Sequence, residues 1–450
     1  DLRVELHQLP LDRFAAQLPT EGEIDGTLSG DATLSGTLKN PRVALTLRPS
    51  DGVIRLQELD EPLDIAYRNA QITGQFIDDR GNAALQLDLG SNGNASAKVS
   101  IGPEKAGNRS LQGDIAAGFP DLALIAGFVP ALEAVTGRLK LTAALAGTTD
   151  APRVDGQLTV EDGSARLPAV GITLEELQLT VRSDADGPLG LSGQVRSGGG
   201  QIDLNGTITL ANQEAPSVQI SLTGQDFLAS QLPEALVYLS PDLELSGTTL
   251  PYLLSGTLTV PKAQLEIAEV PPSAVKVSPD EIIVGENGEA PSEQSAVDPL
   301  RANVRVVLGD EVSFKGFGLE TRLNGTVDTA VVDGVPRVDG KIELIDGRYR
   351  AYGQDLSIEQ GRLLFAGPPG NPDVDLRALR VSRDGSVKAY VAMTGPLSKP
   401  RPRIYAEPAL PESEALAYLL TGSGLKSANR GQGADIAGAA LALGLDRGEP

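Results

Sequence analysis

The chain repeats one motif in register, and this repetition limits its possible folds more than any other feature. The motif joins Pro-Arg-Val to a later Asp-Gly and a second Arg, and it starts at Pro41, Pro152 and Pro336. In every copy the glycine follows the proline by 11 residues and the second arginine follows it by 14. Gly26 and Gly137 are 111 residues apart, as are Pro41 and Pro152. Repeats at a fixed period form stacks of neighbouring units, so we expect one elongated body without a single round core.

Apolar and polar residues alternate strictly along much of the chain. A period of two is typical of a strand with one apolar and one solvated face. Asp-Gly, Asn-Gly, Gly-Pro and Ser-Gly pairs separate these stretches and indicate turns, and we interpret the repeated Asp-Gly pairs of the motif as turns too. Since most strands follow one another without a helix between them, we expect an antiparallel sheet. The alternation is clearest in residues 27–38, 138–145, 201–210, 254–260, 302–308 and 387–393.

Short helices interrupt the strand pattern. Three segments rich in Leu, Ala and Phe, at 11–18, 120–129 and 226–238, predict helices that start a unit. Pro411, two early acids and Gly422 predict another helix over residues 411–422. Residues 268–299 are rich in proline and acids and predict an exposed loop.

The fold class that follows is all-β, an elongated antiparallel β-trough with an apolar inner face. We expect it to consist of repeats of about 110 residues with a few short helices. The predicted parts are a first β-repeat with its leading helix (residues 1–136), a second β-repeat (137–247) and a C-terminal trough region (248–450).

Composition excludes several classes of function. The chain has no cysteine and one histidine, so thiolate chemistry, histidine metal clusters and histidine triads are absent. Its net charge of −22 repels nucleic acid and anionic membrane faces. No run of 18 apolar residues or signal peptide is present, and the opening at Asp1 in mid-pattern leads us to expect a piece of a longer protein. We expect no enzymatic activity, metal or cofactor.

Charged residues offer two candidate sites. Asp373 and Asp375 are spaced like a metal pair, but we interpret them as two acids on a solvated strand face. The arginines of the motif allow two interpretations: a ladder that contacts phosphate headgroups at a groove rim, or surface cations that pair with the abundant acids. These arginines are Arg42, Arg55, Arg153, Arg166, Arg337 and Arg350.

The face of the sheet that carries the apolar residues of each strand is the candidate binding face. An apolar trough that side chains cannot fill is a ligand site by default, and a continuous one suits long alkyl chains. Each methylene group transferred from water contributes roughly 0.8 kcal/mol, so acyl chains need no specific contact. The residues predicted to line this groove are Leu28, Leu34, Leu38, Leu45, Leu139, Leu141, Leu158, Val160, Ile202, Leu204, Ile208, Leu258, Val260, Val304, Val306, Ile342, Leu344, Val387 and Val391.

Three stretches resemble the C-terminal region of the TamB family, the translocation and assembly module subunits of the AsmA-like, bridge-like lipid transfer group. Residues 340–367 read GKIELIDGRYRAYGQDLSIEQGRLLFAG, and Asn371-Pro372 and DLRA follow. Residues 270–284 read VPPSAVKVSPDEIIV, and residues 414–422 read EALAYLLTG. Tyr349, Tyr352 and Gly353 match the family pattern, and we interpret them as a packed turn.

The resemblance implies the periplasmic part of an inner-membrane anchored protein of a diderm bacterium. It implies a β-trough, or β-taco, that moves phospholipid toward the outer membrane and contributes to outer-membrane biogenesis. The implied protein partner is TamA, an outer-membrane barrel of the BamA type. The family's membrane anchor and last strands do not match any part of this chain, so we expect both outside it.

Two other functions stay open. One is a chaperone or translocase scaffold that secretes and assembles autotransporter-type proteins by pairing an open sheet edge with an unfolded substrate. The other is a structural spacer. The conduit requires a continuous apolar inner face, the scaffold a free edge strand, and the spacer a filled interior.

Overall fold

The structure is a computed structural model, and it consists almost entirely of β-strands. It describes residues 2–17, 22–37, 40–56, 63–105, 107–123, 129, 131–183, 187–209, 216–267, 300–332, 334–351 and 354–424. The chain divides into two compact units. Unit 1 comprises Asp1–Ala229 and Glu244–Thr249, and unit 2 comprises Ser230–Leu243 and Leu250–Pro450. The three-part division expected from the sequence stays a prediction.

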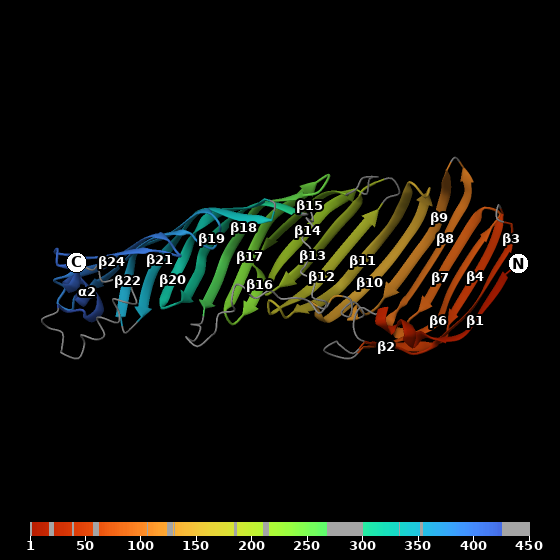
Figure 1. The fold of residues 1–450 in the computed structure, drawn as a ribbon, viewed down its shortest axis with the longest axis horizontal. Helices are drawn as coiled ribbons and strands as arrows, with labels where there is room; N and C mark the ends of the chain where they lie inside the picture. The colour runs from red at the N-terminus through yellow and green to blue at the C-terminus, as the bar shows by residue number, and fades with distance from the viewer. Residues whose placement is uncertain are drawn as a thin grey trace, which may run out of the picture. The chain divides into compact units, whose positions relative to one another are not determined.

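Unit 1 is an open antiparallel sheet whose strands follow chain order. Its hydrogen-bonded neighbours run β1, β3, β4, β6, β7, β8, β9, β10, β11, β12, β13, β14 and β15, side by side in Figure 1. No pair among the described residues joins β1 to β15, so the sheet is not closed. Short strands β2 and β5 pair with each other, and β5 pairs with the first part of β6, in a small second sheet.

The bounds of these elements are β1 Leu2–Pro10, η1 Leu11–Gln17, β2 Gly22–Ile24, β3 Thr27–Gly36, β4 Pro41–Pro49, β5 Gly52–Leu56, β6 Leu63–Ile77, β7 Arg80–Asp88, η2 Gly90–Asn92, β8 Asn94–Lys105, β9 Asn108–Phe119, β10 Glu133–Gly147, β11 Pro152–Leu167, β12 Ile172–Ser183, β13 Leu189–Ser197, β14 Gly200–Thr209 and β15 Ser217–Gln225. β16 (Phe227–Leu232) and β17 (Ala235–Gly247) contribute residues to both units.

The 111-residue repeat of the sequence is also a repeat of structure. The Leu11 amide donates to the Gly26 carbonyl at 3.0 Å, and the Leu122 amide donates to the Gly137 carbonyl at the same distance. Both glycines have positive φ, 123° and 127°. A residue with a Cβ is strained at such angles, which explains why glycine occupies both positions.

Bulges crease the sheet of unit 1 near one edge. The register of β11 against β12 shifts around Asp162, whose φ is 51°, and that of β12 against β13 shifts around Glu176, also at 51°. Each bulge adds one outward residue, so Val160 and Ala165 keep the same face on either side of it. Both residues belong to one buried cluster with Leu122, so the sheet bends toward its apolar face. The result is an unclosed, trough-like sheet.

The prediction of turns at the repeated Asp-Gly pairs was wrong for two of the three. Asp162-Gly163 lies inside β11 and Asp346-Gly347 lies inside β21, each as a bulge. Only Asp51-Gly52 lies at a break, between β4 and β5. Aspartate tolerates the left-handed region that a bulge and a turn both require, so the dipeptide does not distinguish them.

The helix predictions had mixed outcomes. Residues 11–17 form a 3₁₀ helix, whereas of 120–129 only a few residues are described, Ala123 among them in a helical conformation. The helix predicted over 226–238 was wrong, because β16 ends at Leu232 and β17 begins at Ala235. Pro233, which has no amide donor, lies in the turn between them. The predictions at 268–299, Tyr352 and Gly353 lie outside the described residues.

The strands of unit 2 also form open sheet, and they include one parallel pair. β18 (Tyr252–Ile267) runs parallel to β19 (Leu300–Gly316), which departs from the antiparallel pairing expected throughout. The remaining neighbours are antiparallel and follow chain order from β19 to β25. Their bounds are β20 Leu319–Val332, β21 Val335–Ala351, β22 Gln354–Gly367, β23 Asp373–Val381, β24 Lys388–Pro396 and β25 Arg401–Glu407.

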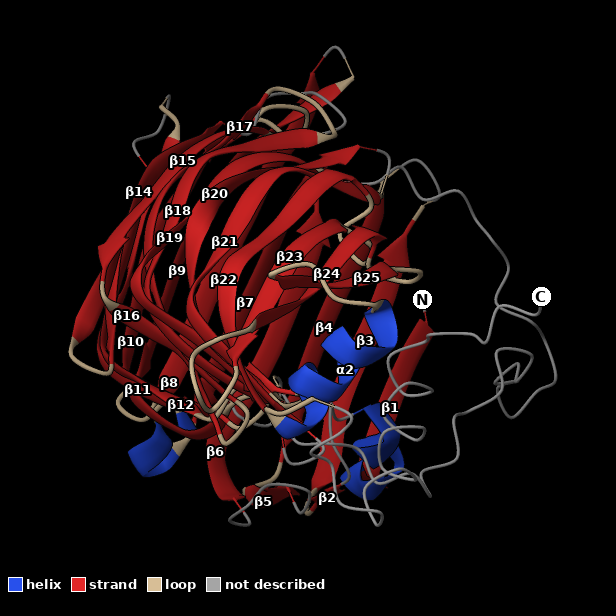
Figure 2. Ribbon diagram, turned by 90° about the vertical axis from the view of Figure 1, so that its left-hand side faces the viewer, coloured by secondary structure: helices blue, strands red, loops and turns tan. Residues whose placement is uncertain are grey.

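One α-helix, α2 (Glu412–Thr421), follows β25 and packs against this sheet (Figure 2). It starts after Pro411, carries Glu412 and Glu414 in its first turn and ends at Thr421, and the next residue, Gly422, adopts the left-handed conformation with φ 71°. The helix predicted over residues 411–422 is therefore confirmed, with the expected terminal residues.

Candidate functional site

The strand register places the apolar residues of neighbouring strands in unit 1 on one continuous face of the sheet. Residues directly opposite each other on neighbouring strands share a face of the sheet, so the pairs can be followed from strand to strand. One such row is Leu6, Gly30, Leu47, Ile72, Leu85, Ala97, Ile115, Ala143 and Gly156. Another is Leu87, Ala95, Ala117, Leu141, Leu158, Val181, Leu191, Gly206 and Ile220.

The described groove residues of unit 1 lie on this apolar face. The pairs Leu139–Val160 and Leu141–Leu158 join β10 to β11. Leu34, whose partner is Val43, extends the face across β3 and β4. The other predicted residues on it are Leu28, Leu45, Ile202, Leu204 and Ile208, whereas Leu38 lies outside the described residues.

The exposure of the apolar face changes along the strands, from the crease to the strand ends on the other side of the sheet from the crease. We call these strand ends the rim. Val160, at the crease, is 9% exposed. Leu34 is 46% exposed and Leu85 is 40% exposed, well away from the crease. Packing is therefore dense where the sheet bends, and the remaining surface of the same face is open to a ligand.

Unit 2 has an apolar face of the same construction. One row runs Val260, Leu308, Gly325, Ile342, Leu363, Val374 and Gly395. Val304 and Val306 follow the same parity along β19, Leu258 lies opposite Val306, and Leu344 pairs with Leu323. Val260 belongs to a buried cluster with Ala263 and Val312, which fills part of this face.

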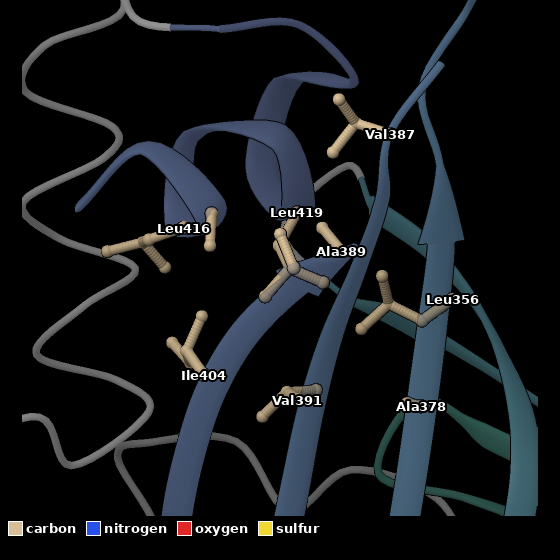
Figure 3. Close-up of a cluster of buried hydrophobic side chains, with 10 residues drawn as sticks. Leu356, Ala378, Val387, Ala389, Val391, Ile404, Leu416 and Leu419 are labelled. Carbon is tan, nitrogen blue, oxygen red and sulfur yellow. The ribbon is translucent and has the colours of Figure 1, made fainter. Parts of the chain in front are cut away.

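Helix α2 covers the apolar face over the last strands of unit 2. Val387, which immediately precedes β24, and Val391 belong to a buried cluster with Leu416 and Leu419 of the helix. Figure 3 shows the helical side chains directed toward the strand residues. Val391 is 4% exposed, so these two predicted groove residues are packed against protein in this structure.

Arg380 of β23 forms hydrogen bonds with the C-terminal end of α2. Its Nη1 donates to the carbonyls of Leu419 and Leu420 at 2.7 and 3.0 Å, where the helix presents its unpaired acceptors. Burial, followed by the nearby charge of Arg383, lowers the pKa of the Arg380 guanidinium. The amide of Arg383 also donates to the Gly422 carbonyl at 3.3 Å. The helix is thus held by both packing and hydrogen bonds.

The opposite face of unit 1 is polar and carries ion pairs. Its rows include Glu5, Asp31, Thr46, Thr73, Ala84, Lys98, Asp114, Ala144 and Asp155. Asp31 of this row lies 3.7 Å from Arg48, which shares the parity of Thr46 on β4. The contrast between the two faces matches the alternation of the sequence.

The motif arginines with identified partners lie beside acids, as one of the two interpretations proposed. Arg42 lies 3.6 Å from Asp78, and Arg55 lies 2.7 Å from Asp25. Arg166 lies 3.7 Å from Glu133, and Arg350 lies 3.2 Å from Glu320. Arg153 also has an interaction partner. At these positions the ion pairs favour the interpretation as surface cations paired with acids over the interpretation as a ladder that contacts phosphate headgroups.

The other charged candidates do not converge on a reactive site. Within the described ranges, no three residues among His, Asp and Glu are grouped so as to hold a metal ion. Asp375 accepts a hydrogen bond from Gln360 at 2.7 Å, and Asp373 is exposed. His7 lies 3.4 Å from Glu5 at the surface. Tyr349 packs against the cluster beneath α2.

Sequence reasoning missed the small residues of the apolar face. Gly74 pairs with Leu45 and Ala83, and a Cβ built on it would meet only the Leu45 Cβ, at 4.0 Å. Such small residues leave more space above the apolar face and add no polar side chain to it. These residues share the parity of the apolar residues on the same strand, and this could have identified them. Glycine also indicates turns, and the sequence pattern alone does not distinguish the two roles.

An open antiparallel sheet that repeats along its length, bends toward an apolar face and leaves part of it uncovered defines the class of β-trough proteins. The family model of the TamB C-terminal domain matches residues 190–447, and that of the TamB N-terminal domain matches residues 1–160. The first match covers more than half of the chain, so the chain belongs to the TamB family. This confirms the resemblance seen in residues 340–367 and 414–422.

A curated relative agrees with this membership. The chain is 26% identical over 357 residues to the translocation and assembly module subunit TamB of Haemophilus influenzae. The alignment covers 76% of this chain and 27% of the relative, so the chain spans about a quarter of that protein's length. No helix among the described residues is both long and apolar enough to cross a membrane.

Proposed function

We propose that this chain is part of a non-enzymatic conduit in which phospholipid acyl chains lie on the apolar face and move along it. The observation that supports the proposal is the uninterrupted succession of apolar rows across unit 1, with side chains such as Leu34 and Leu85 left about half exposed. A folded protein seldom leaves a long apolar surface in water without a ligand or partner for it.

The energetics favour alkyl chains. Each methylene group removed from water contributes roughly 0.8 kcal/mol, so a chain of about ten methylenes half covered by the sheet gains on the order of 4 kcal/mol. Because most positions of the apolar face are Leu, Ile, Val, Ala or Gly, neighbouring positions differ little in affinity. A ligand held without specific contacts can slide from one strand to the next.

The setting of the conduit belongs to the same proposal. We infer a periplasmic location in a diderm bacterium, an inner-membrane anchor outside this chain, and transport toward the outer membrane. The protein partner would be the outer-membrane barrel TamA. The family membership and the relative's name, a translocation and assembly module subunit, support this setting.

Site-specific photo-crosslinking tests the proposal. A photoreactive residue replaces Ile208 on the apolar face or Thr209 on the polar face of β14, in the full-length protein in cells. Ile208 should crosslink to phospholipid and Thr209 should not, although the two residues are adjacent in sequence. Mass spectrometry of the adducts identifies the lipid.

Two results would count against the conduit. Equal lipid labelling from both positions would mean that lipid contact does not depend on the apolar face. Crosslinks from Ile208 to unfolded outer-membrane protein instead of lipid would favour the scaffold that assists secretion and assembly.

A further inference from the structure

We propose that the β24–β25 hairpin of unit 2 is a docking surface for an anionic lipid bilayer. The proposal concerns contact with a membrane surface and does not depend on acyl chains lying on the apolar face. It rests on the charge of this hairpin, on the residue at its tip and on the neighbouring hairpin tips.

The hairpin is locally basic within a strongly acidic chain. Residues 385–406 contain four cations and no acid, whereas the whole chain has a net charge of −22. Lys399, Arg401 and Arg403 fall within five residues, and all three are exposed. Because charges further away than the Debye length, about 10 Å at 0.1 M salt, are largely screened, a surface nearby meets this local charge and not the net charge.

These three cations also lack acidic partners. Among the residues that the structure describes, no carboxylate lies within ion-pair distance of Lys399, Arg401 or Arg403, and Arg403 instead lies over the ring of Tyr405 at 5.8 Å. One acid of the hairpin and one acid of the neighbouring strand β23 are engaged in hydrogen bonds. Asp375 accepts from Gln360 at 2.7 Å, and Glu407 accepts from the Tyr390 hydroxyl at 3.3 Å.

An apolar residue stands at the tip of the basic hairpin. Leu397 is 52% exposed between Pro396 and Lys399. Its amide donates to the Pro372 carbonyl at 2.9 Å, and the Ser398 amide donates to Asn371 Oδ1 at 2.9 Å. These bonds tie the tip to the β22–β23 turn, so Leu397 is presented on an ordered support.

The adjacent hairpin tips extend the surface, because they lie at the same ends of the strands of unit 2 as the β24–β25 tip. In an antiparallel meander, alternate connections lie at one edge, so the β20–β21, β22–β23 and β24–β25 turns share these strand ends. The first carries Val335, which is 60% exposed, and the second carries exposed Pro368 and Pro369. A row of apolar tips, with three exposed cations beside the β24–β25 tip, fits a broad bilayer surface better than a narrow peptide, because apolar residues enter the interface while cations contact headgroups.

Tryptophan fluorescence offers a direct test, because the chain contains no tryptophan. Leu397→Trp places a single reporter at the basic tip. Ile77→Trp places a matched reporter at the β6–β7 tip, where Ile77 is 38% exposed but precedes Asp78 and Asp79. With vesicles of phosphatidylglycerol mixed with phosphatidylcholine, the emission at 397 should shift to the blue and that at 77 should not.

Vesicle flotation tests the role of the charges. Replacing Lys399, Arg401 and Arg403 by glutamine should lower the partition coefficient to the anionic vesicles by about two orders of magnitude. The control replaces Lys98, Lys140 and Arg182, exposed on the polar face of unit 1, and removes the same charge with little effect. Binding of the native chain should also weaken as salt is added.

The proposal is overturned if the native chain does not float with anionic vesicles, as expected for a surface that binds an acidic protein. It is also overturned if phosphatidylcholine vesicles bind equally well, or if the hairpin and control triple variants bind alike. Circular dichroism and a thermal unfolding curve establish that both triple variants are folded, so that loss of binding reports on the hairpin.

Discussion

The proposed conduit function predicts that replacing Leu85 by aspartate slows lipid movement along unit 1 about a hundredfold. Leu85 lies on the apolar face between Ile72 and Ala97 and is 40% exposed. A carboxylate among hydrocarbon costs about 3 kcal/mol, and each 1.36 kcal/mol in a barrier changes a rate tenfold. Because a sliding ligand must pass every position, one charged position is sufficient to limit the rate.

The same substitution should leave the fold intact. Leu85 is already partly exposed, so its replacement removes about 1 kcal/mol of burial, against a typical domain stability of about 5–15 kcal/mol. The matched control is Gln86→Asp, which places the same charge one residue along β7 on the polar face. This variant should transport at the native rate.

The assay is the initial rate at which pulse-labelled phospholipid reaches the outer membrane, in cells that depend on the full-length protein. Protease resistance of each variant establishes that it is folded. A folded Leu85→Asp variant that transports at the native rate would refute the reasoning, as would equal slowing by Gln86→Asp.

Three further predictions concern stability and titration. Val391→Asp, beneath α2, should cost about 4 kcal/mol by urea unfolding, and Leu34→Asp near the rim about 1 kcal/mol, because only the first buries an unpaired charge; equal losses would show that α2 does not exclude water. Gly137→Ala should cost about 2–3 kcal/mol, since φ is 127° and its Cβ would lie 2.8 Å from a backbone carbon, whereas Gly118→Ala, with open space, should change stability by less than about 0.5 kcal/mol. The hydroxyls of two nearby serines lower the pKa of Asp384 from 3.8 to about 2, so its contribution is fully present above about pH 4 and is lost as the pH falls through 2; a carboxyl titration by NMR with a midpoint near 4 would contradict this.

The alternation of residues predicted the β architecture because it reports directly on the two faces of a strand. Leu139 and Leu141 alternate with polar residues on β10, and the register then places them opposite Val160 and Leu158. The sequence could not show the crease in the same way. Two consecutive acids, Glu161 and Asp162, interrupt the alternation at the bulge, and such a pair can equally indicate a turn.

Other features depend on contacts that no local pattern encodes. The segment 226–238 has apolar residues compatible with either period, and only its pairing selects strands. The apolar side chains of α2 and the apolar parity of β24 are both visible in the sequence, but nothing there indicates that Leu416 and Leu419 cover Val391. The parallel pairing of β18 with β19 likewise depends on tertiary structure, because residues 268–299 separate the two strands.

The chain-order meander of unit 1 has a mechanical consequence. Each strand is bonded only to its neighbours, so a load applied at β1 acts on the bonds between β1 and β3 before it reaches any other pair. Such a sheet should yield one strand at a time at low force, and released strands should rejoin in the same order. Under load, a sheet of this design should therefore lose and regain its strands in order, while the strands that are still paired keep their register.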